Sequence, residues 1–266
     1  MGGALVEALL EGGSEVTALV RGDAAARRLA DMGATVVRGD IGQSVYWDRR
    51  AEAADVIFHL GLPRLLPPMR GRHLRKAEKE AAAGAEVIRE VAAGGDVVMS
   101  GCAIATDAGP LALARPALAA EAVLAGPATR VVRLPWAYGP QGFLCDISRG
   151  LQMRRFRMVG PAVNHIAVVG ARDAADALLA AASAPAGTYT LAEVEPPTQE
   201  QLVNHICLSR GAPRPDRLPP AMARGSMGGV FVEAFTADQR VEPAPPPGFI
   251  ARQRWDRDMM EAFAGG

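Results

Sequence analysis

Short apolar runs alternate with amphipathic segments along the first half of the 266-residue chain. Runs rich in apolar and β-branched residues have the length of buried strands and lie at 15–21, 35–40, 54–61, 96–101 and within 129–140. Apolar positions at helical spacing, or a high alanine content, predict helices over 2–12, 24–33, 74–95 and 115–126. This alternation predicts an α/β fold, in which a doubly wound parallel sheet is covered by helices on both faces.

The pattern becomes less regular after Gly142, and we interpret this change as the start of a second, smaller region. Helices are expected over 171–185 and 197–211, with a short strand between them at 187–192. Thr198 and Gln201 have the spacing of a capping box at the start of the second helix. The proline-rich stretch 241–249 excludes helix and central strand, so we expect it to connect to a short terminal helix.

Composition and charge narrow the classes of function. Hydrophobic residues make up 49% of the chain, enough for one large core with or without a small cap. The 29 basic and 29 acidic side chains cancel, which gives no electrostatic reason to expect nucleic acid or an anionic membrane as partner. The three cysteines and four histidines lack the spacing of disulfide frameworks or metal sites, so we expect neither. No apolar run approaches a membrane span, and Glu7 and Glu11 argue against a signal peptide, so a cytoplasmic protein is expected.

Six segments, in this order, resemble the extended short-chain dehydrogenase/reductase superfamily, which contains the NAD-dependent sugar epimerases and dehydratases. They are GGALVEALLEGGSEVTALVRG (2–22), VVRGD followed by Ile41 (36–41), DVIFHLG (55–61), MSGCAIATDAGPLALARPALAAE (99–121), RLPWAYGP (133–140) and NHIAVVGARDAADALLAAASAP (164–185). The resemblance covers nearly the whole chain. It implies a Rossmann-type NAD(P)-binding domain over 1–142 and a smaller substrate-binding region over 143–266, interleaved with the last strands of the sheet.

The resemblance also implies where a cofactor would bind. The positions that would contact NAD or NADP are Gly2, Arg21, Asp40, Ile41, Leu60, Gly61 and Pro135. Gly2 would be the last glycine of the phosphate-binding turn, where a helix N-terminus approaches the pyrophosphate. Arg21 follows the second strand, where a cation favours the 2′-phosphate of NADP; a solvated arginine at a strand end is the alternative. A small-molecule substrate and a homodimer are the partners that the resemblance implies.

The chain departs from the family at its start. The family's first strand and its first two glycines would precede Met1. A start assigned too late in the gene would explain this departure. The alternative is a protein that has discarded dinucleotide binding.

The family's catalytic pair is absent. Its reaction uses a tyrosine whose pKa is lowered by a lysine four residues later, on the same face of a helix. Tyrosine occurs here only at 46, 138 and 189, and none is followed four residues later by lysine. Matching the segments places Leu113 at the tyrosine, Ala117 at the lysine and Gly101 at the helping serine. An apolar pair cannot move a proton, so the redox site is degenerate.

Four polar residues remain as candidates for catalysis: Ser100, Cys102, Tyr138 and His165. Histidine can titrate near neutral pH and act as a general acid or base. Each of the four has a structural alternative: packing at a strand end for Ser100 and Cys102, and a hydrogen-bonded structural role for Tyr138 and His165. Trp136 and Trp255 could wall a pocket for a flat substrate, although burial alone would account for either.

We therefore expect a non-redox biosynthetic enzyme of isomerase, lyase or cyclase type, which positions and desolvates a small organic substrate. One alternative is an NAD(P)-dependent reductase or epimerase with a substitute proton donor, such as Tyr138 or a bound water. Another alternative is a non-catalytic protein that senses a dinucleotide or supports a partner. NAD or NADP binding is implied by the fold in each case, unless it has been lost.

Overall fold

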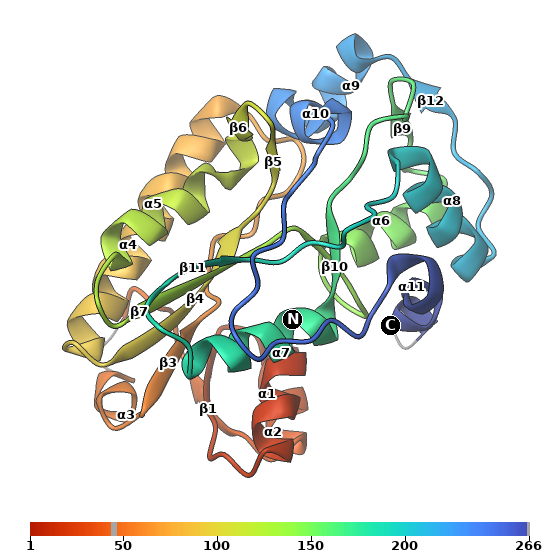
Figure 1. The fold of residues 1–266 in the computed structure, drawn as a ribbon. Helices are drawn as coiled ribbons and strands as arrows, with labels where there is room; N and C mark the ends of the chain where they lie inside the picture. The colour runs from red at the N-terminus through yellow and green to blue at the C-terminus, as the bar shows by residue number, and fades with distance from the viewer. Residues whose placement is uncertain (44–46, 265–266) are drawn as a thin grey trace.

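The computed structural model describes residues 1–43 and 47–264; Tyr46, one of the three tyrosines, lies outside them. The helices are α1 (Gly2–Glu11), α2 (Asp23–Asp31), α3 (Asp48–Glu52), α4 (Gly71–Ala92), α5 (Arg115–Leu124), α6 (Phe143–Gln152), α7 (Ala171–Ala182), α8 (Gln199–Arg210), α9 (Pro220–Met227), α10 (Gly229–Thr236) and α11 (Trp255–Ala264), with a 3₁₀ turn η2 (Ala112–Ala114). The strands are β1 (Thr17–Val20), β2 (Thr35–Arg38), β3 (Val56–His59), β4 (Asp96–Cys102), β5 (Ala105–Thr106), β6 (Gly109–Pro110), β7 (Thr129–Leu134), β8 (Trp136–Tyr138), β9 (Met158–Val159), β10 (Val168–Gly170), β11 (Gly187–Thr190) and β12 (Arg217–Leu218). Figure 1 shows them as a sheet with helices on both faces and a helical region at one end.

A parallel sheet forms the centre of the molecule, and this confirms the predicted fold class. Four strands pair in the order β11-β7-β4-β3, all of them parallel. β1 and β2 form a separate parallel pair, and within the described chain no strand pairing joins this pair to the four-stranded sheet. The sheet is therefore in two parts.

The two faces of the sheet are covered by different helices because side chains alternate along each strand. On β4, Val97 and Met99 pack with α4 and α5, whereas Val98 packs with α7 on the other face. Figure 1 shows α4 and α5 lying together on one side, and α1 lying beside α7 on the other. The sheet is thus buried on both faces, as parallel sheets require.

Side-chain contacts alone join the β1–β2 pair to the rest of the sheet in the described chain. Leu5 of α1 belongs to the same apolar cluster as Val56 and Phe58 of β3. On the opposite face, Leu19 of β1 and Ile57 of β3 pack into the cluster that α4 covers. Arg172 of α7 adds ion pairs to Glu7 and Glu11 of α1. The contact between the two parts lacks the strand-to-strand hydrogen bonds of a continuous sheet.

A single apolar cluster joins the sheet to the C-terminal helices. Leu113 of η2 shares it with Trp136, Phe231 and Phe235, and α10 packs directly on η2. The Met69 N–H donates to the Met227 carbonyl at 3.0 Å, which fixes the junction of α9 and α10 against the loop before α4. The core therefore continues across the boundary expected at Gly142.

The helices of the C-terminal region were the least predictable. The capping box of Thr198 and Gln201 is present at the start of α8, and α11 is the expected terminal helix. The sequence reading missed α6, α9 and α10. The latter two have only eight residues each, so they offer about two turns of periodicity, too little to stand out from a glycine-rich loop.

An ion pair over Gly101 joins α5 to β7. The Arg133 guanidinium donates to Glu121 through Nη2 at 2.6 Å and Nε at 3.0 Å. Glu121 is only 8% exposed. A Cβ on Gly101 would lie 2.9 Å from the Arg133 Cγ and would overlap the Glu121 carboxylate.

We expect Gly101→Ala to lower the free energy of unfolding by about 1–3 kcal/mol, because the added methyl group displaces the buried ion pair. Urea denaturation monitored by circular dichroism measures this change. Gly225→Ala is the matched control: its Cβ would meet open space in α9, and alanine favours a helix, so it leaves stability equal or slightly higher. A Gly101→Ala protein as stable as the wild type would contradict the packing described.

Candidate functional site

The positions of the missing catalytic pair are filled by apolar core. Leu113 and Ala117 are 5% and 3% exposed. Leu113 packs with Ile104 and Leu111 in the cluster that α10 closes. In the described structure, neither of these two positions therefore presents a group that can transfer a proton.

Ser100 and Cys102 lie at the end of β4, beside this packed region. Ser100 is 2% exposed and pairs in register with Val132; Cys102 pairs with Leu134. Burial raises the pKa of the Cys102 thiol to about 11. The thiol is therefore protonated at neutral pH and is a poor nucleophile there.

The residues expected at the adenosine end of a cofactor are accessible. The Arg21 and Asp40 side chains are 73% and 48% exposed and face each other, with 3.6 Å between Nη1 and Oδ2. The Gly42 N–H donates to the other Asp40 oxygen at 3.1 Å, which orders the turn. Ile41 packs against Gly84 of α4.

The remaining expected cofactor positions differ in exposure. Gly2, at the start of α1, and Gly61, after β3, are exposed, and Leu60 lies beside Gly2. A cavity of about 350 Å³ adjoins the start of α1 and is lined in part by Arg28. Pro135, at the nicotinamide end, is buried. Of the positions expected to contact a cofactor, those near the adenosine and phosphates are thus mostly exposed, whereas Pro135 is buried.

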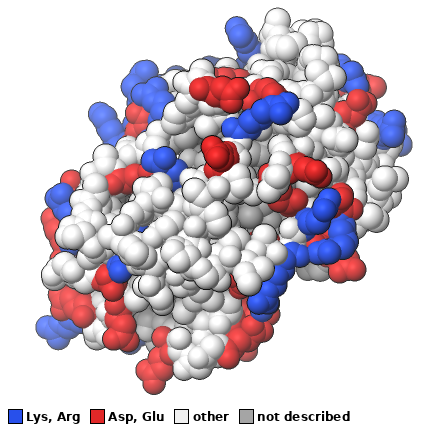
Figure 2. All heavy atoms as spheres, in the orientation of Figure 1, with Lys and Arg blue, Asp and Glu red and all other residues white. Residues whose placement is uncertain are grey.

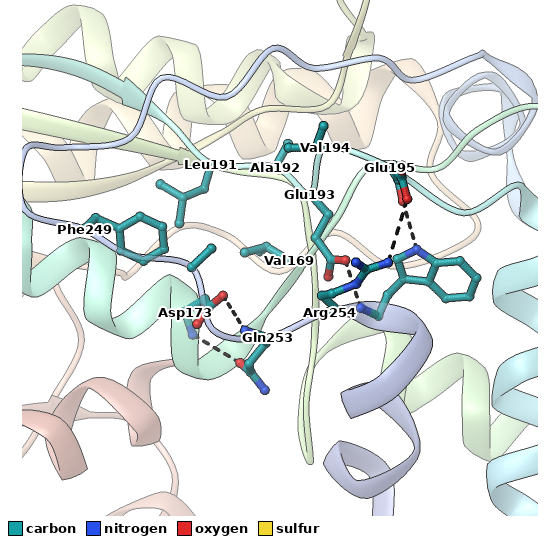
Figure 3. Close-up of a pocket in the computed structure, with 12 residues that line it drawn as sticks. Val169, Asp173, Leu191, Ala192, Glu193, Val194, Glu195, Phe249, Gln253 and Arg254 are labelled. Atoms are coloured by element: carbon teal, nitrogen blue, oxygen red, sulfur yellow. Dashed lines mark hydrogen bonds and ion pairs between the residues drawn. The ribbon is translucent and has the colours of Figure 1, made fainter.

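A second cavity, of about 320 Å³, lies between the loop that follows β11 and the segment that precedes α11 (Figure 3). Its apolar walls are Val169, Leu191, Ala192, Val194, Phe249, Ala251 and the ring of Trp255; its polar lining comprises Asp173, Glu193, Glu195, Gln253 and Arg254. Trp255 therefore does line a pocket, as its sequence position allowed. Trp136 packs instead on Phe143, with 4.9 Å between ring centroids.

Glu193 is the titratable group at this cavity with a pKa near neutrality. One carboxylate oxygen, Oε2, accepts a hydrogen bond from the backbone N–H of Trp255 at 2.8 Å. The other oxygen, Oε1, is buried and has no hydrogen-bond partner. Burial raises the pKa of Glu193 to about 7, against the smaller opposing effect of the Trp255 N–H.

The Tyr138 hydroxyl lies beside the Glu193 carboxyl. Tyr138 is fully buried on β8, and its hydroxyl, like the Glu193 Oε1, forms no hydrogen bond of good geometry. Burial, and secondly the negative charge of Glu193, raise the pKa of this phenol. The phenol is therefore a weak acid, although its O–H remains available as a neutral hydrogen-bond donor.

Asp173 fixes the segment that closes the cavity. Its Oδ2 accepts the Arg252 and Gln253 N–H groups, each at 3.0 Å. In return, the Gln253 Oε1 accepts the N–H groups of Arg172 and Asp173 at 3.0 and 3.2 Å, which satisfies the start of α7 (Figure 3). Burial raises the pKa of Asp173 as well.

His165 belongs to a separate surface cluster. Its ring Nδ1 and its backbone N–H both contact the Asp238 Oδ1 at 2.7 Å. Arg240 donates to the other Asp238 oxygen at 2.9 Å, and this hydrogen bond holds the pKa of Asp238 far below its usual range. Of the four candidates, then, Ser100 and Cys102 lie together, while Tyr138 and His165 lie apart from them and in different surroundings.

The sequence analysis did not single out Glu193. It sits in an acidic, proline-rich loop that has the composition of solvent-exposed chain. Its burial comes from Trp255, 62 residues later, and no local pattern signals such a contact. The same holds for His205 of α8, whose Nε2 is buried and whose ring packs on Trp255, with 5.6 Å between ring centroids.

On the face in Figure 2, acidic and basic side chains are interspersed. Within residues 1–43 and 47–264, no cluster of three or more His, Cys, Asp or Glu could hold a metal ion. Among the same residues, no helix has the length and apolarity to cross a membrane.

We expect Glu193→Gln to change how stability depends on pH. A carboxyl whose pKa is raised from 4.5 to about 7 on folding binds its proton more tightly when folded. The wild type therefore loses stability relative to the variant as the pH rises through that window. Urea denaturation at about pH 5 and about pH 8 measures the difference, wild type minus variant, which should fall.

Glu195→Gln, in the same loop with a side chain 84% exposed, is the control and should show no such trend. A Glu193→Gln difference that stays flat or rises with pH would mean that the carboxyl is not desolvated.

Comparison with known proteins shows similarity in structure and not in sequence. No family model and no curated protein matches the chain. A UDP-glucose 4-epimerase from Thermotoga maritima, solved with UDP-glucose, superposes with a TM-score of 0.78 at 14% identity, over 99% of this chain and 94% of that one. A UDP-glucose 4-epimerase from Thermus thermophilus, in complex with NAD, gives 0.76 at 16% identity, over 99% and 94%. A human epimerase family protein with NADPH gives 0.71 at 16% identity, over 91% and 87%.

These structures superpose over nearly the full length of this chain. At such low identity the similarity concerns the fold. The chain has the fold of the extended short-chain dehydrogenases/reductases, in which NAD-dependent epimerases and dehydratases are built.

Proposed function

We propose that the protein is a non-redox enzyme of isomerase, lyase or cyclase type, which acts on a small organic molecule in the cavity beside Glu193. The observation that supports this proposal is the position of the groups that can exchange a proton. Buried apolar groups, Leu113 and Ala117, occupy the positions of the redox pair. A carboxyl with a pKa of about 7 instead lines a cavity of about 320 Å³.

In this proposal, Glu193 transfers protons to and from the substrate. With a pKa near the working pH, a carboxyl is present in both protonation states, so it can take a proton from a substrate and return it elsewhere. The Tyr138 O–H beside it can donate a hydrogen bond without being ionised. Isomerisation and elimination need this exchange of protons and no hydride.

The walls supply orientation and exclude water. Phe249 and Trp255 present aromatic surface, and the Trp255 indole is fixed by donating to the Glu195 carbonyl at 2.9 Å. A substrate held against such surfaces loses water around its reacting atoms, which strengthens its interaction with the carboxyl. Two of the similar structures are UDP-glucose 4-epimerases, which supports the scaffold and leaves the non-redox reaction class to rest on the cavity itself.

We expect no hydride transfer. Purified protein incubated with NADH or NADPH and a panel of aldehydes, ketones and nucleotide sugars should leave the absorbance at 340 nm unchanged. A metabolite extract incubated without added nucleotide should show a product of unchanged mass, or one lighter by water, in mass spectrometry.

For that product, Glu193→Gln should lower the rate at least about 100-fold, the usual contribution of a general acid or base. Glu90→Gln, at an exposed position of α4 outside the cavity lining, should leave it unchanged. Transfer of deuterium from 4-deuterated NADPH to a product at rates ordinary for reductases would refute the proposal.

A second candidate, nucleotide binding without turnover, is favoured by the exposed Arg21–Asp40 pair. A nucleotide could bind through its adenosine and phosphates at this edge while the packed region around Leu113 excludes its nicotinamide ring. The reductase alternative gains less support, because the buried, weakly acidic Tyr138 is a poor substitute proton donor.

This second candidate predicts that NADPH and 2′-phospho-ADP-ribose, which lacks nicotinamide, bind with affinities within about two-fold of each other in isothermal titration calorimetry. Arg21→Ala should weaken both several-fold, since it removes the cation beside the 2′-phosphate. Arg89→Ala, on α4 and paired with Glu86, is the control and should have no effect. NADPH binding more than ten-fold tighter than the fragment would show that the nicotinamide end is open after all.

A further inference from the structure

The cavity beside Glu193 combines apolar walls with buried oxygens that have no partner. The fully buried Tyr138 hydroxyl and the Glu193 Oε1 both lack a well-formed hydrogen bond. Unpaired buried polar atoms are costly, and native structures normally pair them with protein, water or ligand. Of the two residues, Glu193 belongs to the cavity lining and Tyr138 does not, so the Glu193 carboxyl is the group that a ligand in the cavity would contact.

The charges around Glu193 favour a donor that is positive. The groups facing it are Tyr138 of β8, Asp173 of α7, Arg254 and Asp256 at the start of α11, and His205 of α8 behind Trp255. Asp256 and Asp173 both raise the pKa of Glu193, so the field at the carboxyl is negative. Arg254, which also lines the cavity, is paired with Asp256 at 3.1 Å and with Glu195 at 3.8 Å.

The walls favour an organic body on that cation. Phe249 and the ring of Trp255 supply aromatic surface, and Leu191 and Val169 supply aliphatic surface. A cation over an aromatic face gains about 0.5–2 kcal/mol, more when it is desolvated. A bare metal ion suits the site poorly, because Mg²⁺ and Ca²⁺ need six or more oxygen ligands and most of this lining is apolar.

We propose that this cavity binds a small primary amine in its ammonium form, with a flat apolar body, through the Glu193 carboxylate. The ammonium group donates to the carboxylate and compensates the negative field. The flat body lies between Phe249 and Trp255. The inference rests on the proposed function for its site and gives that site a substrate class.

Calorimetric titration with benzylamine tests the inference. Benzylamine is protonated at both about pH 6 and about pH 8, so the change in affinity reports on the protein. Because the Glu193 pKa is about 7, the ionised fraction rises about ten-fold between these two values, and affinity should rise by the same factor. Benzyl alcohol, of similar shape and without charge, should bind at least ten-fold more weakly at about pH 8.

Two kinds of variant distinguish the contribution of the carboxyl to binding from the contribution of the cavity space. Glu193→Gln should weaken benzylamine binding at least ten-fold and remove the pH dependence. Glu90→Gln, exposed on α4 outside the cavity lining, should stay within two-fold of the wild type. Ala251→Leu, at an exposed lining position, should weaken benzylamine and benzyl alcohol alike by filling the cavity. Urea denaturation of each variant shows that the fold is retained.

Equal binding of benzyl alcohol and benzylamine, or an unchanged affinity in Glu193→Gln, would overturn the inference. Its failure is distinguishable from failure of the proposed function. Amine binding without any turnover sustains the inference and removes the enzyme, whereas turnover that requires Glu193 without amine binding does the reverse.

Discussion

The carboxylate of Asp173 is the contact on which the candidate site depends. By accepting two backbone N–H groups, it ties the last connector of the chain to the first turn of α7, and the Gln253 side chain returns the interaction. This pairing places Trp255 next to Glu193, so the burial of Glu193 follows from it. Without it, the loop after β11 would face water, and Glu193 would be an ordinary surface carboxylate.

A dehydrogenase of this fold combines nucleotide binding with hydride transfer. In this structure, the residues expected for these two properties lie in different surroundings. At one edge, the side chains of Arg21 and Asp40 are exposed and paired with each other. At the other, Leu113 has joined a core that runs into the C-terminal helices. A scaffold changed in this way can still hold ligands at the carboxyl ends of its strands, where α/β sheets bind them, without transferring a hydride there. Chemistry then has to come from another part of the same edge, and the loop after β11 provides a titratable group for it.

Regular elements were predictable from the sequence wherever the signal was local. The five strand segments and the capping box at Thr198 lie where their patterns placed them, because periodicity and capping act over a few residues. The apolar replacements at Leu113 and Ala117 could also be found in advance, since they stand in a recognisable segment. The burial of Glu193, the unexposed Nε2 of His205 and the short helix α10 could not, because each depends on chain more than 30 residues away.

The division of the sheet has a consequence for how the molecule opens. β4 is paired on both sides, whereas β1 in the described chain is paired only to β2. Native proteins open locally in cooperative units, and a unit attached by side-chain contacts alone opens at a smaller free energy than one bonded through its backbone. The first forty residues therefore form a segment whose amides exchange with solvent deuterium sooner than those of β4 and β7. A nucleotide bound across Arg21 and Asp40 would slow the exchange of the amides in that segment.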